Sequence, residues 1–251
     1  MDALLRTLSL PAQILSRVPG LGSLIKVCST TVGQKILMAI SGLSLCGFLV
    51  AHLAGNLKLY AGEQSFNDYA HALHSLGPLL AVAEIGLFSM FALHIGLAVS
   101  TSALNKVARG KDYFIKETKQ GVSILPGGAS SWMMVTGLVV LFFLVCHIID
   151  MKLKVGPGVD YTPALNAEKI VDNEYQAVKA VLSTPSRAFI YIVGLVALGI
   201  HLSHGIRSAL QTLGINHKRW NTILYYVCVA VAWTLSAGFI SLVIWAVGGK
   251  S

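Results

Sequence analysis

The chain has 251 residues, of which 55% are hydrophobic and 12% are charged, and its formal net charge is +8. Soluble globular domains carry about 25% charged residues, so this composition, with a mean hydropathy of +0.69, excludes an ordinary soluble domain and indicates several membrane spans of roughly 20 residues each. The positive charge does not indicate nucleic-acid binding, because the basic residues lie between apolar blocks and form no patch interleaved with aromatic side chains.

Four cysteines, Cys28, Cys46, Cys146 and Cys228, are scattered singly, and the chain contains no CxxC or CxxCH motif. This spacing indicates neither a disulfide framework nor covalent attachment of a c-type haem. Cys46 and Cys146 fall inside apolar runs, where a free thiol acts as a small hydrophobic side chain. We therefore expect them to be core residues.

Apolar blocks predict an all-α integral membrane protein with five transmembrane helices, at 35–57, 78–104, 131–150, 186–212 and 221–247. Thr31 and Gln34 have capping-box spacing before the first helix. The second helix is expected to open at Pro78. Thr184 and Pro185 are typical of the N-cap and first position of the fourth helix.

Residues 1–34 contain no apolar core long enough for a cleaved signal peptide. The stretch "LLRTLSLPAQILSRVPGLGSLIK" mixes apolar and basic residues, which suits a segment that lies along a membrane surface. We expect residues 1–34 to form a cytoplasmic or interfacial segment and residues 35–250 to form one transmembrane domain.

Basic residues predict the orientation of the helices. The N-terminal segment, the 105–130 connection and the turn after the fourth helix hold most of the lysines and arginines and few acidic residues. The loops on the opposite side hold basic and acidic residues in equal numbers. Because cytoplasmic loops are enriched in lysine and arginine, we expect the amino terminus in the cytoplasm and the carboxyl terminus outside.

Eight histidines divide into two groups. His71 and His74 fall in an outer loop and His217 in an inner turn, so we expect these three to be solvated surface residues. The other five lie on four different apolar helices: His52, His94, His147, His201 and His204. Ionisable groups inside a membrane are costly and generally functional, and one such group on each of four helices indicates a shared site.

Depth sorts four of these histidines into two pairs. His52, His94, His147 and His201 each lie about 23–26 Å along their own helix, which is the far third of a hydrocarbon core of roughly 30 Å. The first and third helices run outward, and the second and fourth run inward. His52 and His147 therefore form an outer pair, and His94 and His201 form an inner pair.

Paired neutral imidazoles on facing helices are what bis-histidine ligation of haem b requires. Glycines on all four helices would let a porphyrin approach the backbones, although small residues also serve plain helix packing. Zinc is disfavoured, because its structural sites gather four ligands at one point and favour thiolates. We expect the first four helices to form a haem-binding bundle.

The strings "AHLAGN" around His52, "FALHIG" around His94, "CHIID" around His147 and "HLSHGIR" from His201 carry a family resemblance. Together they resemble the single-subunit, five-helix, di-haem cytochrome b anchors of bacterial succinate dehydrogenases and fumarate reductases, over roughly residues 30–247. The resemblance implies that His94 and His201 bind the inner haem and that His52 and His147 bind the outer one.

The resemblance also implies partners and a pathway. A flavoprotein subunit and an iron–sulfur subunit would perform the dicarboxylate chemistry, since this chain has no motif for flavin or dicarboxylate. The chain would anchor them in the bacterial cytoplasmic membrane and pass electrons through two haems b to a quinone, with menaquinone favoured over ubiquinone. A higher oligomer of this respiratory complex II is compatible with the family.

Acidic residues near the outer side are candidates for the quinone site. Asp68, in "QSFNDYAHALH", sits about where such enzymes carry an acidic residue near their quinone. Glu84 lies about 9 Å into its helix, where it contributes to that site or pairs with a hydroxyl or a haem propionate. Gly199 stands where some family fumarate reductases have a glutamate, which makes fumarate reduction less favoured.

The string "HLSHGIR" places two histidines one turn apart, so helical periodicity alone does not choose between them. Depth slightly favours His201, and the His-x-x-x-Gly-Ile-Arg pattern of the family favours it further. We expect His204, about 4.5 Å nearer the cytoplasm, to contact a propionate, a quinone or the partner subunit. Arg207 would pair with anionic propionates at the membrane interface.

Two other functions fit parts of the pattern. A di-haem cytochrome b of a hydrogenase or formate dehydrogenase would keep the ligands and change the partner. A haem-free transporter could use the histidines as a proton relay, but relay histidines should approach a common path near the midplane of the membrane. Two layers near opposite faces favour the cytochrome.

Overall fold

The computed structural model describes residues 30–109, 129–157 and 173–249. Within these ranges the chain is helical and contains no strand. Five of the described helices are long and apolar enough to cross a membrane. They are α3 (Thr31–Asn56), α5 (Pro78–Arg109), α6 (Ala129–Met151), α9 (Pro185–Thr212) and α10 (Asn221–Gly248). The all-α fold with five membrane-spanning helices is thus confirmed, whereas the expected segment 1–34 lies almost wholly outside the described residues.

The hydrogen bonds at the first residues of α3 and α9 differ from those expected from the sequence. The N-cap of α3 is Thr30, whose hydroxyl accepts a hydrogen bond from the Gly33 amide at 3.0 Å, so the cap lies one residue before Thr31. Thr184 is the N-cap of α9 and Pro185 is its first residue, as predicted. The Thr184 hydroxyl, however, donates to the Ala180 carbonyl of the preceding helix at 2.9 Å.

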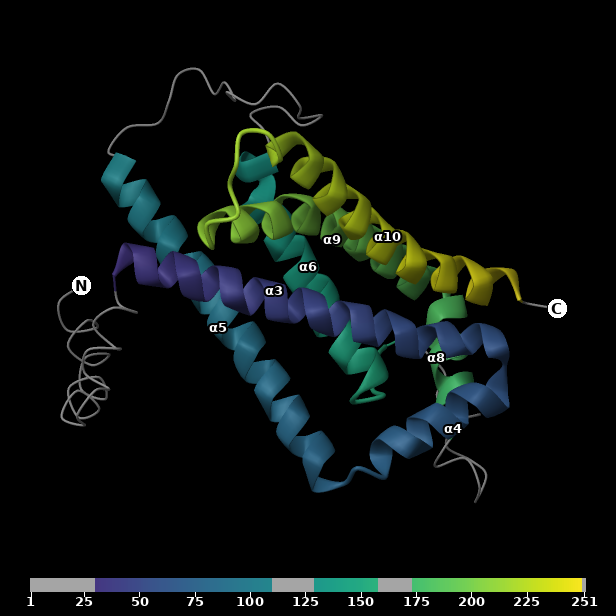
Figure 1. Cartoon of the computed structure of the whole chain (residues 1–251). Helices are drawn as coiled ribbons and strands as arrows, with labels where there is room; N and C mark the ends of the chain where they lie inside the picture. Colours follow the sequence, from purple (N-terminus) through teal and green to yellow (C-terminus); the bar gives the residue numbers. More distant parts are fainter. Residues whose placement is uncertain (1–29, 110–128, 158–172, 250–251) are drawn as a thin grey trace.

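Three short helices fill segments that were expected to be loops: η1 (Leu57–Ala61), α4 (Glu63–His74) and α8 (Glu174–Ser183). His71 and His74 therefore lie on a helix and not in a loop, although both are exposed as expected. Phe66 of α4 and Val181 of α8 are buried, so each short helix attaches through a few apolar side chains. Figure 1 shows α4 and α8 at the same end of the long helices.

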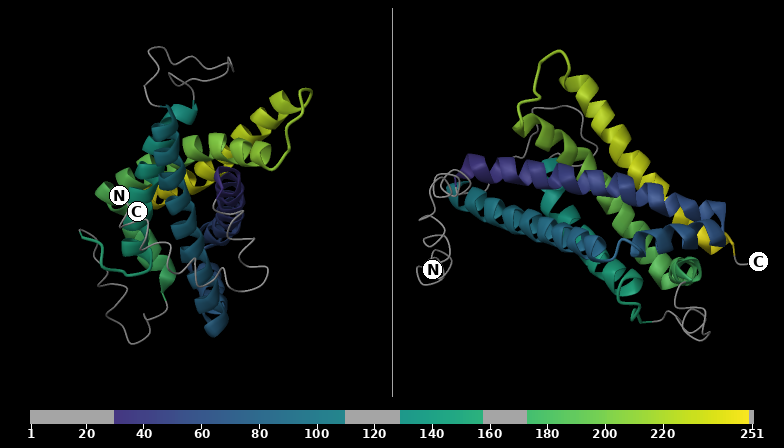
Figure 2. Two further views of the ribbon diagram at one scale, coloured as in Figure 1. Left: turned by 90° about the vertical axis from the view of Figure 1, so that its left-hand side faces the viewer. Right: turned by 60° about the horizontal axis from the view of Figure 1, so that its bottom comes forward.

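Helix α9 is the centre of the bundle, since it packs against α10, α6 and α3. Helix α5 packs chiefly against α3 and diverges from the other long helices in both views of Figure 2. Ser236 of α10 is completely buried, and its hydroxyl donates to the Leu195 carbonyl of α9 at 2.7 Å. Small polar residues of this kind hold helices together where both partner and lipid are apolar.

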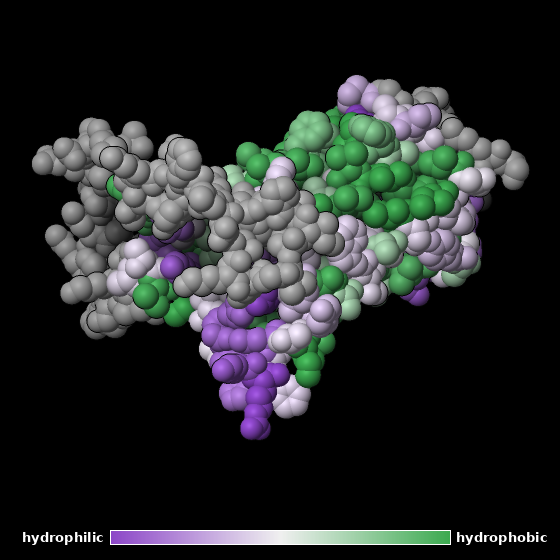
Figure 3. All heavy atoms as spheres, turned by 90° about the horizontal axis from the view of Figure 1, so that it is seen from above, coloured by the Kyte–Doolittle hydropathy of each residue, from purple (hydrophilic) through white to green (hydrophobic). Residues whose placement is uncertain are grey.

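The described surface is apolar over large areas. Hydrophobic residues gather at the upper right of the face in Figure 3, and hydrophilic residues gather in a projection at its lower edge. In the most apolar stretch of α5 no residue is buried. Leu79, Val82 and Ile85 are each more than 60% exposed. Such a surface suits contact with lipid or with another apolar group.

Candidate functional site

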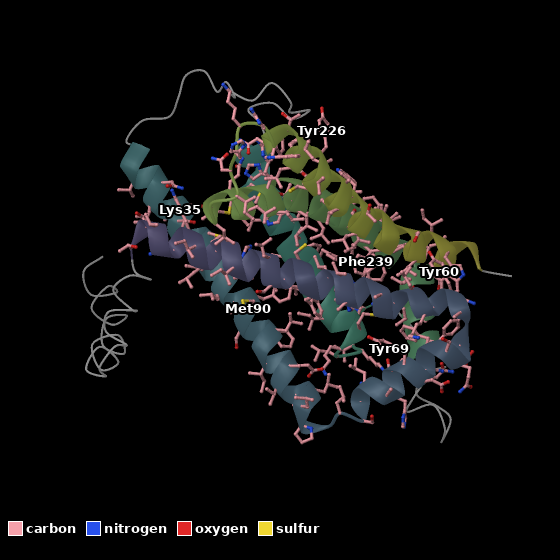
Figure 4. The ribbon with its side chains drawn as sticks, viewed as in Figure 1. Lys35, Tyr60, Tyr69, Met90, Tyr226 and Phe239 are labelled. Carbon is pink, nitrogen blue, oxygen red and sulfur yellow. The ribbon has the colours of Figure 1, made fainter. Side chains whose placement is uncertain are left out.

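The outer pair, His52 and His147, meets inside the bundle. His52 lies on α3 and His147 on α6, and their ring centroids are 5.8 Å apart with an angle of 85° between the planes. Phe48 stacks on His52 at 5.2 Å, and Phe239 contributes a ring from α10 at 5.7 Å. Figure 4 labels Phe239 alongside α3. Helix α10 therefore contacts this pair through an aromatic side chain and contributes no histidine.

The spacing of this pair suits one metal atom between the rings. A metal–imidazole bond is about 2 Å long, so two axial imidazoles on one metal have ring centroids about 6 Å apart. The Nδ1 atom of His147 is buried and has no hydrogen-bond partner among the described residues. An orphaned buried nitrogen is costly unless it gains a partner, which is consistent with a site that binds another group.

The inner pair, His94 and His201, is held by the helices that carry the outer pair. The Ser41 Oγ of α3 lies 3.1 Å from the Nδ1 of His94 on α5. The Thr136 Oγ1 of α6 lies 3.2 Å from the Nδ1 of His201 on α9. His94 and His201 also lie near each other.

Two glycines make these approaches possible. A Cβ on Gly42 would lie 3.2 Å from the Cε1 of His94, and a Cβ on Gly137 would lie 3.4 Å from the Cε1 of His201. A side chain at position 42 would press on the His94 ring, whereas one at position 137 would be in ordinary van der Waals contact with the His201 ring. The glycines therefore form a cradle for the inner pair, in addition to any role in helix packing.

The two pairs occupy separate layers. Ser41 precedes His52 by 11 residues, and Thr136 precedes His147 by the same number. At 1.5 Å per helical residue, this spacing separates the layers by about 16 Å. The structure thus places His52 beside His147, and in the other layer it places His94 and His201 each against a hydroxyl that the sequence reasoning did not use.

Neither layer resembles a zinc site. Within the described ranges, no group of three or more His, Cys, Asp or Glu side chains could hold a metal ion. Two imidazoles from different helices instead fit an iron whose other ligands come from a planar macrocycle. The donor set and the glycine cradle are therefore compatible with haem.

His204 and Arg207 follow His201 on α9, toward the end of that helix. His204 lies close enough to His201 for their charges to interact. Arg207 is partly buried, and its guanidinium lies over the Tyr225 ring of α10, 5.3 Å from the ring centroid. Both side chains are thus placed beside the inner pair, on its far side from the outer pair.

The two expected quinone-site residues are not brought together. Asp68 on α4 is exposed and accepts a hydrogen bond from the Gln64 amide at 2.8 Å. It lines an open cavity of about 640 Å³ with Lys58, Ser65 and Tyr69. Glu84 on α5 instead pairs with Lys152, which follows α6. A lysine therefore engages the carboxylate, where the sequence suggested a hydroxyl or a propionate.

An ion pair beside the outer pair was missed. Asp150 and Arg187 are both more than 90% buried, and the Arg187 Nη2 lies 3.3 Å from the Asp150 Oδ1. Tyr191 lies beside Asp150, and its ring lies 5.8 Å from that of His147. The signal in the sequence was a carboxylate one turn after His147 and an arginine inside the apolar run of α9.

Ser41 and Thr136 were also missed, although the sequence carries their signal. Residues 38–52 read "MAISGLSLCGFLVAH" and residues 133–147 read "MMVTGLVVLFFLVCH". The two strings share Met, a hydroxyl residue, Gly-Leu, Phe-Leu-Val and His at the same spacing. Helices α3 and α6 are therefore repeats of one another, and their hydroxyl residues occupy equivalent positions.

One comparison with known proteins gives a match. The chain is similar to the succinate dehydrogenase cytochrome b558 subunit of Bacillus subtilis (strain 168), with 24% identity over 194 residues, which is 75% of this chain and 83% of the relative. No protein-family model matches the chain. No solved structure matches it either. The distant match confirms the resemblance to succinate dehydrogenase cytochrome b anchors that the histidine strings indicated.

Proposed function

We propose that this chain is the membrane-anchor cytochrome b subunit of a succinate:quinone oxidoreductase. It binds two haems b, carries electrons from an iron–sulfur partner subunit across the membrane, and delivers them to a quinone. A flavoprotein partner oxidises the dicarboxylate, so the chain itself holds no dicarboxylate site. The complex lies in the bacterial cytoplasmic membrane, with menaquinone as the favoured acceptor.

The observation that carries this proposal is the arrangement of four histidines on four helices in two layers. The rings of the outer pair are 5.8 Å apart, which supports His52 and His147 as ligands of one iron. The inner pair is held by equivalent hydroxyls on α3 and α6. A proton relay would need closer spacing than about 16 Å between its layers, so the layout supports electron transfer between two cofactors over a transporter.

The residues divide the work of holding the cofactors. His52 and His147 would ligate the outer haem, and His94 and His201 the inner one. Phe48, Phe143 and Phe239 surround the outer pair with apolar rings that exclude water. Arg207 would neutralise a propionate of the inner haem, and His204 would hydrogen-bond one. Bound haem b supplies a one-electron carrier at each layer.

The quinone candidates remain Asp68 and Glu84. Asp68 lines the open cavity at the α4 end, where its exposed carboxylate could take up a proton and then donate it to a ligand carbonyl. Glu84 would first have to leave Lys152. We therefore favour Asp68 as the acidic residue of the quinone site.

The test is to purify the full chain from membranes in mild detergent with its native partners. We expect a reduced-minus-oxidised spectrum with a b-type α-band, two haems per chain, and a flavoprotein and an iron–sulfur protein in the same complex. A preparation without a b-type band would overturn the cytochrome proposal. A band with hydrogenase or formate dehydrogenase subunits would overturn the choice of partner.

A further inference from the structure

The inner pair is distinguished from the outer pair by a hydroxyl at the Nδ1 atom of each ring. Ser41 serves His94, and Thr136 serves His201. The two hydroxyls come from different helices and stand 95 residues apart in the chain, yet each precedes a glycine against which the histidine ring rests. The repeated geometry indicates a shared role and not a chance contact.

The direction of these hydrogen bonds follows from the protons available. The Ser41 hydroxyl donates to the Met38 carbonyl at 3.1 Å, and the Thr136 hydroxyl donates to the Trp132 carbonyl at 3.0 Å. A hydroxyl has one proton, so an oxygen that donates that proton to a carbonyl accepts at the histidine. The donor is therefore the Nδ1–H of the ring, and the lone pair of the neutral imidazole is on Nε2.

A second partner supports the same tautomer. The Met38 backbone also lies near the His94 ring, and the Met133 backbone lies near the His201 ring. A carbonyl oxygen only accepts, so it too requires a proton on Nδ1. Because this partner would remain, removal of the hydroxyl would not leave the Nδ1–H without any acceptor.

We propose that Ser41 and Thr136 are positioning residues for the haem of the inner pair. Each accepts the Nδ1–H of its histidine, which fixes the tautomer and the ring orientation and raises the basicity of Nε2. A more basic axial ligand stabilises ferric over ferrous iron, so the two hydroxyls lower the midpoint potential of this haem. This inference rests on the proposed function, since it requires a haem ligated by His94 and His201.

The outer pair has a different environment. The Nδ1 of His147 has no hydrogen-bond partner among the described residues. The Nε2 of His52 lies 3.4 Å from the side-chain amide of Asn56 on its own helix. Hydroxyl acceptors therefore act only on the haem of the inner pair. Substitutions at Ser41 and at Thr136, which lie on different helices, must then change the spectrum of that same haem.

The experiment uses the full chain in its purified complex. Ser41→Ala and Thr136→Val remove each hydroxyl, Ser41→Thr and Thr136→Ser retain it, and Ser44→Ala is the control, since Ser44 is exposed on the same helix. The readouts are a redox titration that resolves the two haems and the EPR signal of each ferric haem, which reports the relative orientation of its imidazole planes. A His201→Ala variant identifies the inner haem by its loss.

We expect Ser41→Ala and Thr136→Val to raise the midpoint potential and shift the EPR signal of the same haem, which is the one lost in His201→Ala. The other haem should keep its values, and the hydroxyl-retaining variants and Ser44→Ala should match the wild type. Loss of this haem in Ser41→Ala with retention in Ser41→Thr would support the same role.

Three results would overturn the inference: unchanged potentials and signals, effects on different haems, or an equal effect of Ser44→Ala. A wild-type complex without two b-type haems is a separate outcome, because it refutes the proposed function before the hydroxyl variants are compared. The two failures are thus distinguishable.

Discussion

Asp150 and Arg187 show how much a single buried charge matters in this bundle. Both are more than 90% buried, and the Arg187 Nη2 also donates to the Pro157 carbonyl at 3.0 Å. Removing one partner of a buried ion pair leaves an uncompensated charge, which costs about 3–5 kcal/mol. The pair also orients Tyr191, whose ring faces His147.

We predict that Arg187→Met lowers the free energy of unfolding by about 3–5 kcal/mol, because it leaves the Asp150 carboxylate buried without its cation. Replacing both residues, Asp150→Leu with Arg187→Met, should recover most of the loss. Denaturant unfolding of the purified chain in detergent measures both changes.

Lys152→Ala is the matched control for that prediction. It breaks the pair with Glu84, whose side chains are 54% and 35% exposed. Exposed ion pairs contribute at most about 1 kcal/mol, so this variant should unfold nearly as the wild type does. Similar losses for Arg187→Met and Lys152→Ala would contradict the role assigned to burial.

The prediction that His201 and not His204 is the ligand also depends on single residues. His201 contacts Thr136 and the Gly137 cradle, whereas His204 lies one turn further along α9. We predict that His201→Ala abolishes the inner haem and that His204→Ala keeps both haems. Haem content of the purified variants, with the amplitude of each step in a redox titration, measures this. Loss of the inner haem in His204→Ala alone would reverse the ligand assignment.

At the scale of the helix, the sequence predicted the long membrane-spanning helices, because hydropathy determines where they lie. Five apolar runs gave the five long helices to within a few residues, except that α5 continues to Arg109. The short helices α4 and α8 escaped, because each is about half polar and attaches through a few buried residues such as Phe66 and Val181. Their helicity depends on tertiary packing, which a search for apolar runs does not detect.

Some residues of the candidate site could likewise be predicted from the sequence, and others could not. The intramembrane histidines and their two layers followed from helix direction and residue counting. The hydroxyls of Ser41 and Thr136 required the relative rotation of four helices, which hydropathy does not fix. The packing partner of Gly199 also depends on helix rotation. A Cβ at this position would lie 3.1 Å from the Ser236 Cβ of α10, so Gly199 faces α10 and serves helix packing.

Gly194 gives the sharpest packing prediction at this scale. A Cβ at Gly194 of α9 would overlap the Cβ and Cγ of Phe143 on α6, which are too close to the backbone to move freely. We predict that Gly194→Ala destabilises the chain by about 1–3 kcal/mol, as overpacked cores do. Thermal unfolding in detergent measures the change.

Gly86→Ala is the control for Gly194→Ala. Gly86 is also inside a membrane-spanning helix, but no described atom lies within 4 Å of the position a Cβ would take. Alanine favours a helix over glycine by roughly 0.5–1 kcal/mol, so stability should hold or rise. An equal loss in both variants would show that glycine itself, and not the contact with Phe143, is required.

At the scale of the molecule, charge separates the two ends of the long helices. Every acidic residue within the described ranges lies at or beyond the layer of His52 and His147: Glu63, Asp68, Glu84, Asp150 and Glu174. Lys35, Arg207, Lys218 and Arg219 lie toward the other end, without acidic neighbours in the described ranges. In Figure 4, Lys35 and Tyr60 mark opposite ends of α3 and the short helix that continues it.

This asymmetry predicts the orientation of the protein in its membrane. Cytoplasmic loops are enriched in lysine and arginine, so the end with Lys35 and Arg219 should face the cytoplasm. An odd number of spans then places the end of α10 outside. We predict that alkaline phosphatase fused after Ser251 is active and that a fluorescent protein fused there is dark, with the reverse in the 213–220 turn. A fluorescent carboxyl-terminal fusion would invert the topology, and with it the placement of the inner pair next to the electron donor.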